Sequence, residues 1–147
     1  MTTYGLKLLQ EDSGSINSEF ARVFYPENTW VDVNGNGAYM AITDGLTSGG
    51  DGPVLALLEC ERPTQASAPG GVTCFGRVRR IATSEWLKLL PKLSAYIKAE
   101  MAKWVGTPAK TLAVLATDEN ANVRYGVARN TSTPAKTLAE LATDKDA

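Results

Sequence analysis

The residues that could carry chemistry lie on two stretches of the N-terminal half of the chain. Glu59 and Glu61 alternate along one predicted strand, and Arg77 and Arg79 alternate along another. If all four met in one pocket, they would suit an enzyme that acts on nucleotides or proteins, and the arginines alone would suit an anion site. A solvated strand face that pairs these charges is the simpler interpretation. We therefore assign no catalytic residue and expect a protein without enzymatic activity.

Metal and cofactor chemistry finds little support in the sequence. The chain has no histidine, which removes the commonest general base and transition-metal ligand. Cys60 and Cys74 alone cannot make a standard structural zinc site. The glycine-rich segment 44–52 lacks the spacing of a phosphate-binding loop, and its two aspartates are too few ligands to argue for calcium. We predict no metal site and no cofactor.

Composition and charge narrow the class of protein further. The chain of 147 residues is 44% hydrophobic and 21% charged, as is ordinary for a soluble globular protein. Residues 1–82 carry 6 basic and 9 acidic side chains, and residues 107–147 carry 5 of each, so neither has the positive excess that a nucleic-acid site needs. No apolar run is long enough to span a membrane, and no signal peptide is visible. We expect a protein of the host cytoplasm or of a virion.

An α+β fold is expected to position these residues. Alternating apolar and β-branched residues predict a mainly antiparallel sheet of five or six strands in residues 1–82. The sequence Asn-Gly-Asn-Gly at 34–37 predicts a tight hairpin between the strands at 29–33 and 38–43. The other predicted elements are strands at 4–10, 20–25, 54–61 and 72–81, with loops at 11–18 and 62–71.

Two registers compete for the antiparallel pairing of the last two strands. One places Cys60 beside Cys74 and would permit a disulfide. The other makes cross-strand charge pairs, which favour it slightly, with Glu61 beside Arg77 and Glu59 beside Arg79. Since no export signal is visible, we expect buried free thiols at both cysteines.

A long amphipathic helix is predicted at 84–104, with Thr83 or Ser84 as its N-cap. Its apolar residues follow the i, i+3, i+4 spacing of one helix face. Pro91 falls in the middle and should kink the helix or split it into two. The predicted organisation is a sheet domain at 1–82, a connecting kinked helix at 83–106 and helical repeats at 107–147.

The repeat consists of two nearly identical blocks, TPAKTLAVLATD from Thr107 and TPAKTLAELATD from Thr133. The blocks agree at 11 of 12 positions and start 26 residues apart, a period typical of stacked supersecondary units. Each threonine hydroxyl is expected to cap a helix, with the proline that follows at the first helical position. The sequence therefore predicts two copies of the same short helix.

A second short helix is expected between the blocks, at about 119–129. Val123, Val127 and Ala128 form its apolar stripe, and Asn130 is expected to end it in a left-handed conformation. The combined pattern TPxxxLxxLAxDxxxxVRxxVAxN resembles the leucine-rich repeat variant family. The matching residues are Thr107, Pro108, Leu112, Leu115, Ala116, Asp118, Val123, Arg124, Val127, Ala128, Asn130, Thr133, Pro134, Leu138, Leu141, Ala142 and Asp144.

That resemblance implies about one and a half repeats of an all-helical solenoid of paired short helices that serves protein interaction. Some members of the family carry an iron–sulfur module with clustered cysteines, but both cysteines of this chain lie outside the repeat. The resemblance therefore implies no cofactor here.

The N-terminal domain carries a second set of landmarks. They are a Tyr-Gly-x-Lys strand, a Trp-x-x-Val strand and strands bearing Glu and Arg, here Tyr4, Gly5, Lys7, Trp30, Val33, Glu59, Arg77 and Arg79. In their order, residues 4–81 are similar to an uncharacterised bacterial and phage domain that often precedes helical repeats. This resemblance implies no particular activity.

About one and a half repeats cannot bury their own apolar edges, because roughly three units are normally needed. Leu138 and Leu141 on the last predicted helix have no following helix to cover them. We expect a protein partner or a second copy of the chain to bind there, with Arg124, Arg129 and Trp104 as further contact residues. The alternative is a small helical appendage that simply packs on the rest of the chain.

The leading functional hypothesis is a non-enzymatic structural protein that docks through its repeats. A phage virion accessory, such as a capsid decoration or minor capsid protein, fits this description. The alternative is a soluble regulator or inhibitor that binds a single host or bacterial protein. Nucleic acid and membrane are not expected partners.

Overall fold

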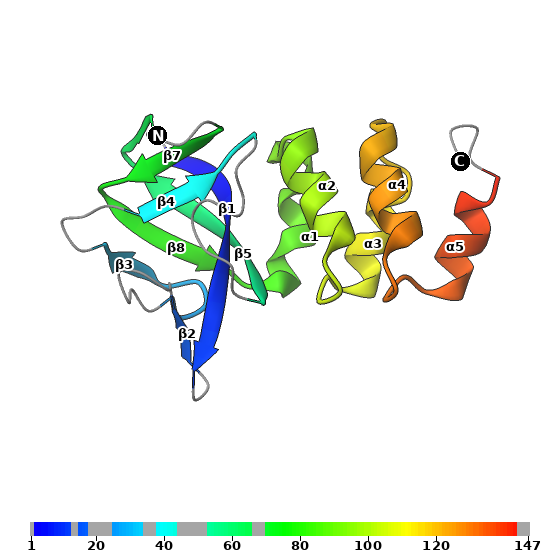
Figure 1. Ribbon diagram of the computed structural model, residues 1–147, viewed down its shortest axis with the longest axis horizontal. Coiled ribbons are helices and arrows are strands. Elements are labelled where there is room, and N and C mark those ends of the chain that lie inside the picture. The colour runs from blue at the N-terminus through cyan, green and yellow to red at the C-terminus, as the bar shows by residue number, and fades with distance from the viewer. Residues whose placement is uncertain are drawn as a thin grey trace. The chain divides into compact units, whose positions relative to one another are not determined.

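The computed structural model describes residues 2–12, 15–17, 25–33, 38–43, 53–65 and 70–143. The chain divides into two compact units, Met1–Ala82 and Thr83–Ala147, each of which is described by itself. A sheet builds the first unit and a series of short helices builds the second (Figure 1). The predicted α+β class, with a mainly antiparallel sheet followed by helices, is confirmed.

The described part of the first unit forms one sheet of eight strands: β1 (Thr2–Asp12), β2 (Ser15–Asn17), β3 (Trp30–Asp32), β4 (Ala38–Ala41), β5 (Val54–Glu61), β6 (Pro63–Gln65), β7 (Gly71–Cys74) and β8 (Arg77–Ile81). Their order is β3-β8-β5-β1-β4-β7-β6, with β2 paired to β1. All of these strand pairs are antiparallel. The strand β5 lies between β8 and β1, where its apolar run is buried on both faces.

The predicted hairpin between β3 and β4 is wrong. In the described residues β3 pairs with β8, whereas β4 pairs with β1 and β7. Long-range pairing has overridden a local turn signal, since each strand finds a partner that is distant in sequence. The turn at 34–37 lies outside the described residues, as do the glycine-rich segment 44–52 and nearly all of the strand predicted at 20–25.

The loop predicted at 11–18 is also wrong in part. The strand β1 continues to Asp12, and β2 pairs back onto its end in the register Gln10↔Asn17. Strands pair through backbone N–H and C=O groups, which every residue except proline supplies. A polar segment such as β2 can therefore pair with the end of β1.

A β-bulge breaks the strand predicted at 72–81 into β7 and β8. The register is Cys60↔Val78 on one side of the break and Pro63↔Cys74 on the other. Between these two pairs, the chain from β5 to β6 advances three residues, from Cys60 to Pro63. The chain from β7 to β8 advances four, from Cys74 to Val78, and the extra residue forms the bulge. A side chain at Gly76 would come within 2.7 Å of a backbone oxygen, so glycine suits this close approach.

The bulge explains how the charge pairs of one predicted register and the disulfide that the other register would have permitted occur together. The charge-paired register is confirmed, because Glu59 lies opposite Arg79. Yet Cys60 and Cys74 also form a disulfide, with their Cα atoms 5.9 Å apart, so the expectation of free thiols is wrong. The offset register brings the two cysteines together in the buried core, which the two straight strands assumed from the sequence could not do.

The second unit contains the α-helices α1 (Trp86–Leu89), α2 (Ala95–Lys103), α3 (Ala109–Leu115), α4 (Ala121–Arg129) and α5 (Ala135–Leu141), with 3-10 turns η2 (Thr83–Glu85) and η3 (Leu90–Lys92). The helix predicted at 84–104 is split, because Pro91 lies in η3 and Leu93 is extended. Ser94 then caps α2 by accepting a hydrogen bond from the Ile97 N–H at 3.3 Å. None of the described helices is long and apolar enough to cross a membrane.

The 26-residue offset extends further back than the matching blocks. Ile97 and Met101 of α2 are buried, and so are Val123 and Val127, their equivalents in α4. The unit therefore holds two helix pairs, α2–α3 and α4–α5, and α2 lies in the segment that was predicted as the connecting helix. The stripe predicted for α4 needs one correction, because Gly126 is buried against α2 while Ala128 is exposed.

Candidate protein-interaction site

The Thr-Pro pairs join successive helices in a way that the sequence did not indicate. The Thr107 hydroxyl donates to the Met101 carbonyl oxygen at 2.5 Å, and the Thr133 hydroxyl donates to the Val127 carbonyl oxygen at 2.7 Å. Neither side chain accepts from the N-terminus of the following helix, where Pro108 occupies the N-cap of α3. The predicted caps are wrong, because buried hydroxyls are better satisfied by the free carbonyls of the preceding helix.

Asn130 is likewise not the left-handed stop that was predicted. Its backbone is extended, with φ −78°. Its side-chain amide donates to the carbonyl oxygens of Ala102 and Trp104, each at 2.8 Å. Asn130 therefore ties the end of α4 to the end of α2, and its side chain rather than its backbone conformation is what the repeat requires.

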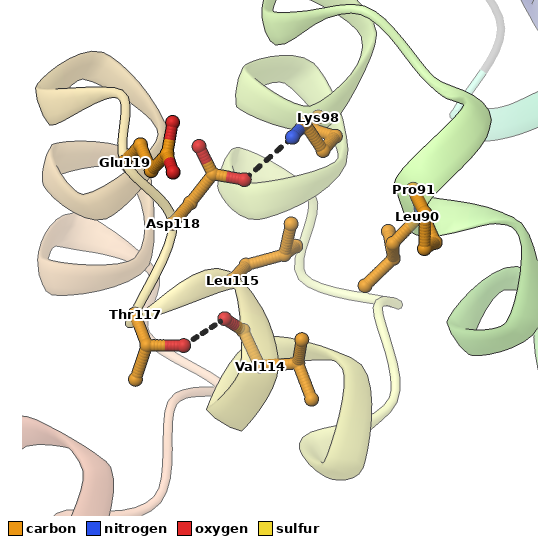
Figure 2. A pocket seen from close by; sticks show the side chains of 8 residues that line it. All are labelled: Leu90, Pro91, Lys98, Val114, Leu115, Thr117, Asp118 and Glu119. Atoms are coloured by element: carbon orange, nitrogen blue, oxygen red, sulfur yellow. Dashed lines mark hydrogen bonds and ion pairs between the residues drawn. The ribbon is translucent and has the colours of Figure 1, made fainter.

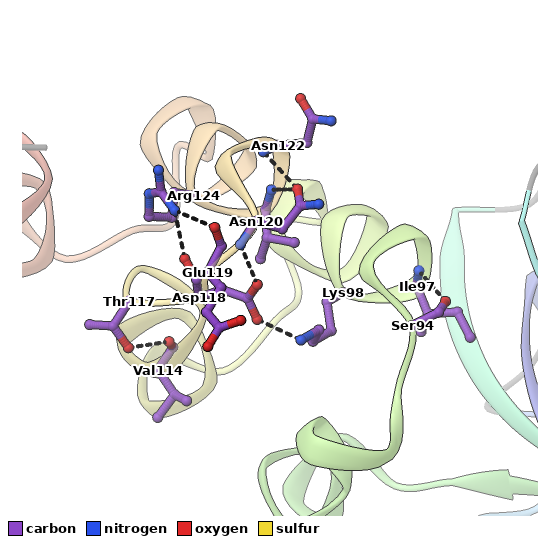
Figure 3. Close-up of polar contacts among 11 residues, drawn as sticks. Ser94, Ile97, Lys98, Val114, Thr117, Asp118, Glu119, Asn120, Asn122 and Arg124 are labelled. Carbon is purple, nitrogen blue, oxygen red and sulfur yellow. Dashed lines mark hydrogen bonds and ion pairs between the residues drawn. The ribbon is translucent and has the colours of Figure 1, made fainter. Parts of the chain in front are cut away.

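Asp118 is the centre of a polar network between α3 and α4 (Figure 3). Lys98 on α2 donates to its carboxylate at 2.6 Å, and the Asn120 N–H donates to it at 2.9 Å. Burial raises the pKa of Asp118, but the hydrogen bonds and the Lys98 charge outweigh burial, so the pKa is lowered on balance. The carboxylate is thus held in its charged form.

Arg124, one of the predicted contact residues, belongs to the same network. Its guanidinium donates to the carbonyl oxygens of Asp118 and Glu119 at 2.7 and 3.0 Å. These carbonyls follow the last turn of α3, where acceptors lack helical partners. The observed role of Arg124 is therefore to join α4, on which it lies, to the end of α3.

A groove opens beside this network, between η3, α2 and α3 (Figure 2). Its volume is about 330 Å³. Figure 2 shows Leu90 and Leu115 facing each other across it, with Val114 beside Leu115. Its lining residues are Leu90, Pro91, Lys98, Val114, Leu115, Thr117, Asp118 and Glu119. The groove joins an apolar part to a charged part.

The outer side of the last helix pair forms a second surface, which we call the end face. It consists of Ala128, Leu138 and Ala142, all of which are exposed. In the preceding pair the positions equivalent to Ala128, Leu138 and Ala142 are Ala102, Leu112 and Ala116, and all three are buried. Leu112 is 0% exposed, whereas Leu138 is 40% exposed. The repeat thus buries these positions once and leaves them open the second time.

An aromatic and cationic pair lies elsewhere on α4, beside Lys103 of α2. Tyr125 is 58% exposed, and its hydroxyl accepts a hydrogen bond from Arg129 at 2.9 Å. The Arg129 guanidinium also lies 5.5 Å from the centre of the Tyr125 ring. A cavity of about 270 Å³ is lined by these two residues, Lys103 and Gly126. Aromatic residues and arginine are enriched where proteins bind one another.

The five predicted contact residues therefore separate into two groups. Leu138 lies on the end face and is exposed, and Arg129 is exposed beside Lys103 of α2. Leu141 is buried, Arg124 is held by backbone carbonyls, and Trp104 packs with its ring 5.7 Å from that of Trp86. The structure gives these last three a place inside the helical unit.

The charged residues of the sheet unit pair two by two across β5 and β8. Arg77 donates to Glu61 at 2.8 Å, and Arg79 donates to Glu59. Both guanidinium groups also lie over the Trp30 ring, at 5.5 and 5.1 Å from its centre. This is the paired strand face that the sequence favoured over an anion site, with each carboxylate bound to the facing arginine.

Comparison with protein-family models, with curated proteins and with solved structures finds no match for this chain. Among the described residues, no group of three or more Cys, Asp and Glu side chains could hold a metal ion. The two surfaces of the helical unit are therefore the candidate binding sites.

Proposed function

We propose that this chain is a non-enzymatic structural protein that docks on a partner protein through the end face of its helical unit. The observation that carries this proposal is the contrast between Leu112 and Leu138, which are equivalent positions of the repeat with opposite exposure. A partner that covered the end face would bury Leu138 as the second helix pair buries Leu112. Fully burying an exposed leucine contributes about 1.5–3 kcal/mol, and Leu138, which is 40% exposed, would contribute the corresponding part of this free energy.

The setting we propose is a phage particle, in which the chain would be a decoration or minor capsid protein. The support for it is the similarity of the N-terminal landmarks to a bacterial and phage domain. The second candidate is a soluble regulator that binds one host or bacterial protein through the same surface. Mass spectrometry of intact particles separates the two, because only the first places this polypeptide in purified particles.

The end face itself is tested by Leu138→Asp, because a carboxylate there would be buried without a partner in the complex. We expect the variant to lose at least about tenfold in affinity for the partner captured by the wild-type chain. Ala113→Asp is the matched control, since Ala113 is exposed on the equivalent α3 and lies outside the end face. Leu141→Asp is unsuitable because Leu141 is buried and its replacement would unfold α5.

The proposal fails on either of two results. One is that wild-type protein remains monomeric and captures nothing that Leu138→Asp does not capture equally. The other is that the control variant loses binding as strongly as Leu138→Asp, which would mean that charge on any helix surface disturbs the complex.

A further inference from the structure

The single position at which the two repeat blocks differ lies on the groove of Figure 2. Val114 in the first block corresponds to Glu140 in the second. Both positions face solvent, and Val114 is 46% exposed. Glutamate is the better helix former of the two. The fold of the repeat therefore accepts a charged residue here, and folding alone gives no reason for valine.

The neighbours of Val114 give the valine a use. Leu90 and Leu115 are buried at the groove, so Val114 extends an apolar wall outward from the core. A cavity of about 330 Å³ lies at the lower end of the range for ligand pockets and has room for one or two side chains. The groove is thus suited to an apolar side chain of a partner.

The polar part of the groove carries a net negative charge. Lys98 and Asp118 neutralise each other as an ion pair of 2.6 Å. Glu119 adds a further carboxylate that is exposed at the groove, and within residues 70–143 it joins no ion pair. A cation held next to the apolar side chain would complement Glu119.

We infer that this groove is a second docking site, which takes a peptide segment of a partner protein that carries an aliphatic side chain next to a lysine or arginine. The aliphatic group packs on Val114, Leu90 and Leu115, and the cation pairs with Glu119. The site lies apart from the end face, so it does not depend on the function proposed for that surface.

The test uses the full chain, labelled with ¹⁵N, and three acetylated and amidated peptides. The first has the sequence Gly-Leu-Gly-Lys-Gly, the second replaces its lysine with glutamate, and the third replaces its leucine with serine. We expect the first to shift the amide resonances of Val114, Leu115 and Glu119. The other two should bind at least about fivefold more weakly. Added salt should weaken the binding of the peptides that carry lysine, because it screens the pairing with Glu119.

The chain supplies its own matched variants. Val114→Glu gives the first block the sequence that folds in the second, so it should retain the fold and lose at least about tenfold in affinity for the leucine–lysine peptide. Glu140→Val makes the opposite change outside the groove and should leave that affinity unchanged. Resonances of α4 report whether either variant has altered the helices.

Two results would overturn the inference. One is equal binding of the leucine–lysine peptide by wild type and Val114→Glu. The other is the absence of shifts around the groove with all three peptides at millimolar concentration. Leu138→Asp should bind the peptide as wild type does, so a failure of the end face and a failure of the groove are distinguishable.

Discussion

Asn130 shows how much of the helical unit depends on single polar side chains. It is buried, and its amide satisfies two carbonyl oxygens at the end of α2. A carbonyl at a helix end has no partner within its own helix, so a buried one needs a donor from elsewhere. Asn130 is this donor, and no apolar residue can replace it.

Asn130→Asp should destabilise the helical unit by about 1–3 kcal/mol, because a carboxylate of the same shape cannot donate to the two carbonyls. Urea unfolding followed by the fluorescence of Trp86 and Trp104 measures the effect. Asn122→Asp is the control, since Asn122 is exposed and its change should cost less than about 0.5 kcal/mol. Equal losses in both variants would contradict the role given to Asn130.

Lys7 is an ionisable residue buried in the sheet. Its Nζ donates to the Tyr39 carbonyl oxygen at 2.8 Å, and burial lowers its pKa to about 8. Since the unfolded pKa is near 10.5, the unfolded chain still holds a proton between these values that the folded chain has lost. The free energy of unfolding must therefore rise with pH in this window.

We expect the sheet unit to gain about 1–2 kcal/mol of stability between pH 7.5 and pH 9.5. Urea titrations followed by the resonances of β5 measure it at each pH. Lys7→Met should remove the rise, because the side chain no longer titrates. If the stability of the wild type stayed constant or fell over this range, burial would not lower the pKa of Lys7.

At the scale of elements, the spacing of α2 and α4 depends on small residues. A Cβ at Gly126 would lie 3.0 Å from the Ala102 Cβ and 3.2 Å from the Ala99 carbonyl oxygen. Helix pairs this close tolerate added atoms poorly, because the backbone must move to make room. The sequence signal for this contact was a glycine inside a predicted helix, which normally costs helix stability.

Gly126→Ala should cost about 1–3 kcal/mol despite the higher helix propensity of alanine. Adding Ala102→Gly removes the shortest of the three close contacts and should recover part of the loss, so the two changes should not be additive. Ala128→Gly, on the exposed side of α4, supplies the cost of glycine alone. If Gly126→Ala were stabilising, the tight approach of the helices would be refuted.

At this scale the sequence predicted elements from their periodicity. It could not predict which distant groups would satisfy the hydrogen bonds of side chains and strands. Leu112 and Leu115 gave their helix directly, because apolar spacing is local. Thr107 was misread because its hydroxyl bonds backward to Met101 in another helix. The turn sequence at 34–37 failed as a hairpin signal for the same reason, since β3 and β4 pair elsewhere.

Over the whole molecule, the division into two compact units predicts that a mutation in one unit lowers the stability of that unit alone. The disulfide between Cys60 and Cys74 lies within the sheet unit and closes a loop with a sequence separation of 14. Removing such a link costs about 3 kcal/mol in the chain-entropy account. The cost should fall on the sheet unit alone.

The Cys60→Ala/Cys74→Ala variant should therefore lower the stability of the sheet by about 2–3 kcal/mol and leave that of the helices unchanged. Hydrogen exchange read at β5 and at α3 in the same sample reports both units together. Equal loss of protection in the two elements would show that they unfold as one cooperative unit.

The candidate surfaces were predictable only in part. Leu138 of the second block was predicted as a contact residue, and the structure leaves it exposed. The groove was missed, although its signal was printed in the sequence as the one mismatch between the blocks, Val114 against Glu140. A mismatch has no meaning until the structure shows that the position faces solvent beside Leu90 and Leu115.

The threonine contacts have an evolutionary consequence. The Thr107 and Thr133 hydroxyls each bond to the carbonyl oxygen six residues earlier, and the two threonines stand 26 residues apart, so these two joins are chemically the same. An in-frame duplication or deletion of 26 codons would recreate these joins without any new mutation. Lineages of this protein should therefore differ in length by whole multiples of that step, with the end face carried along unchanged at the last pair.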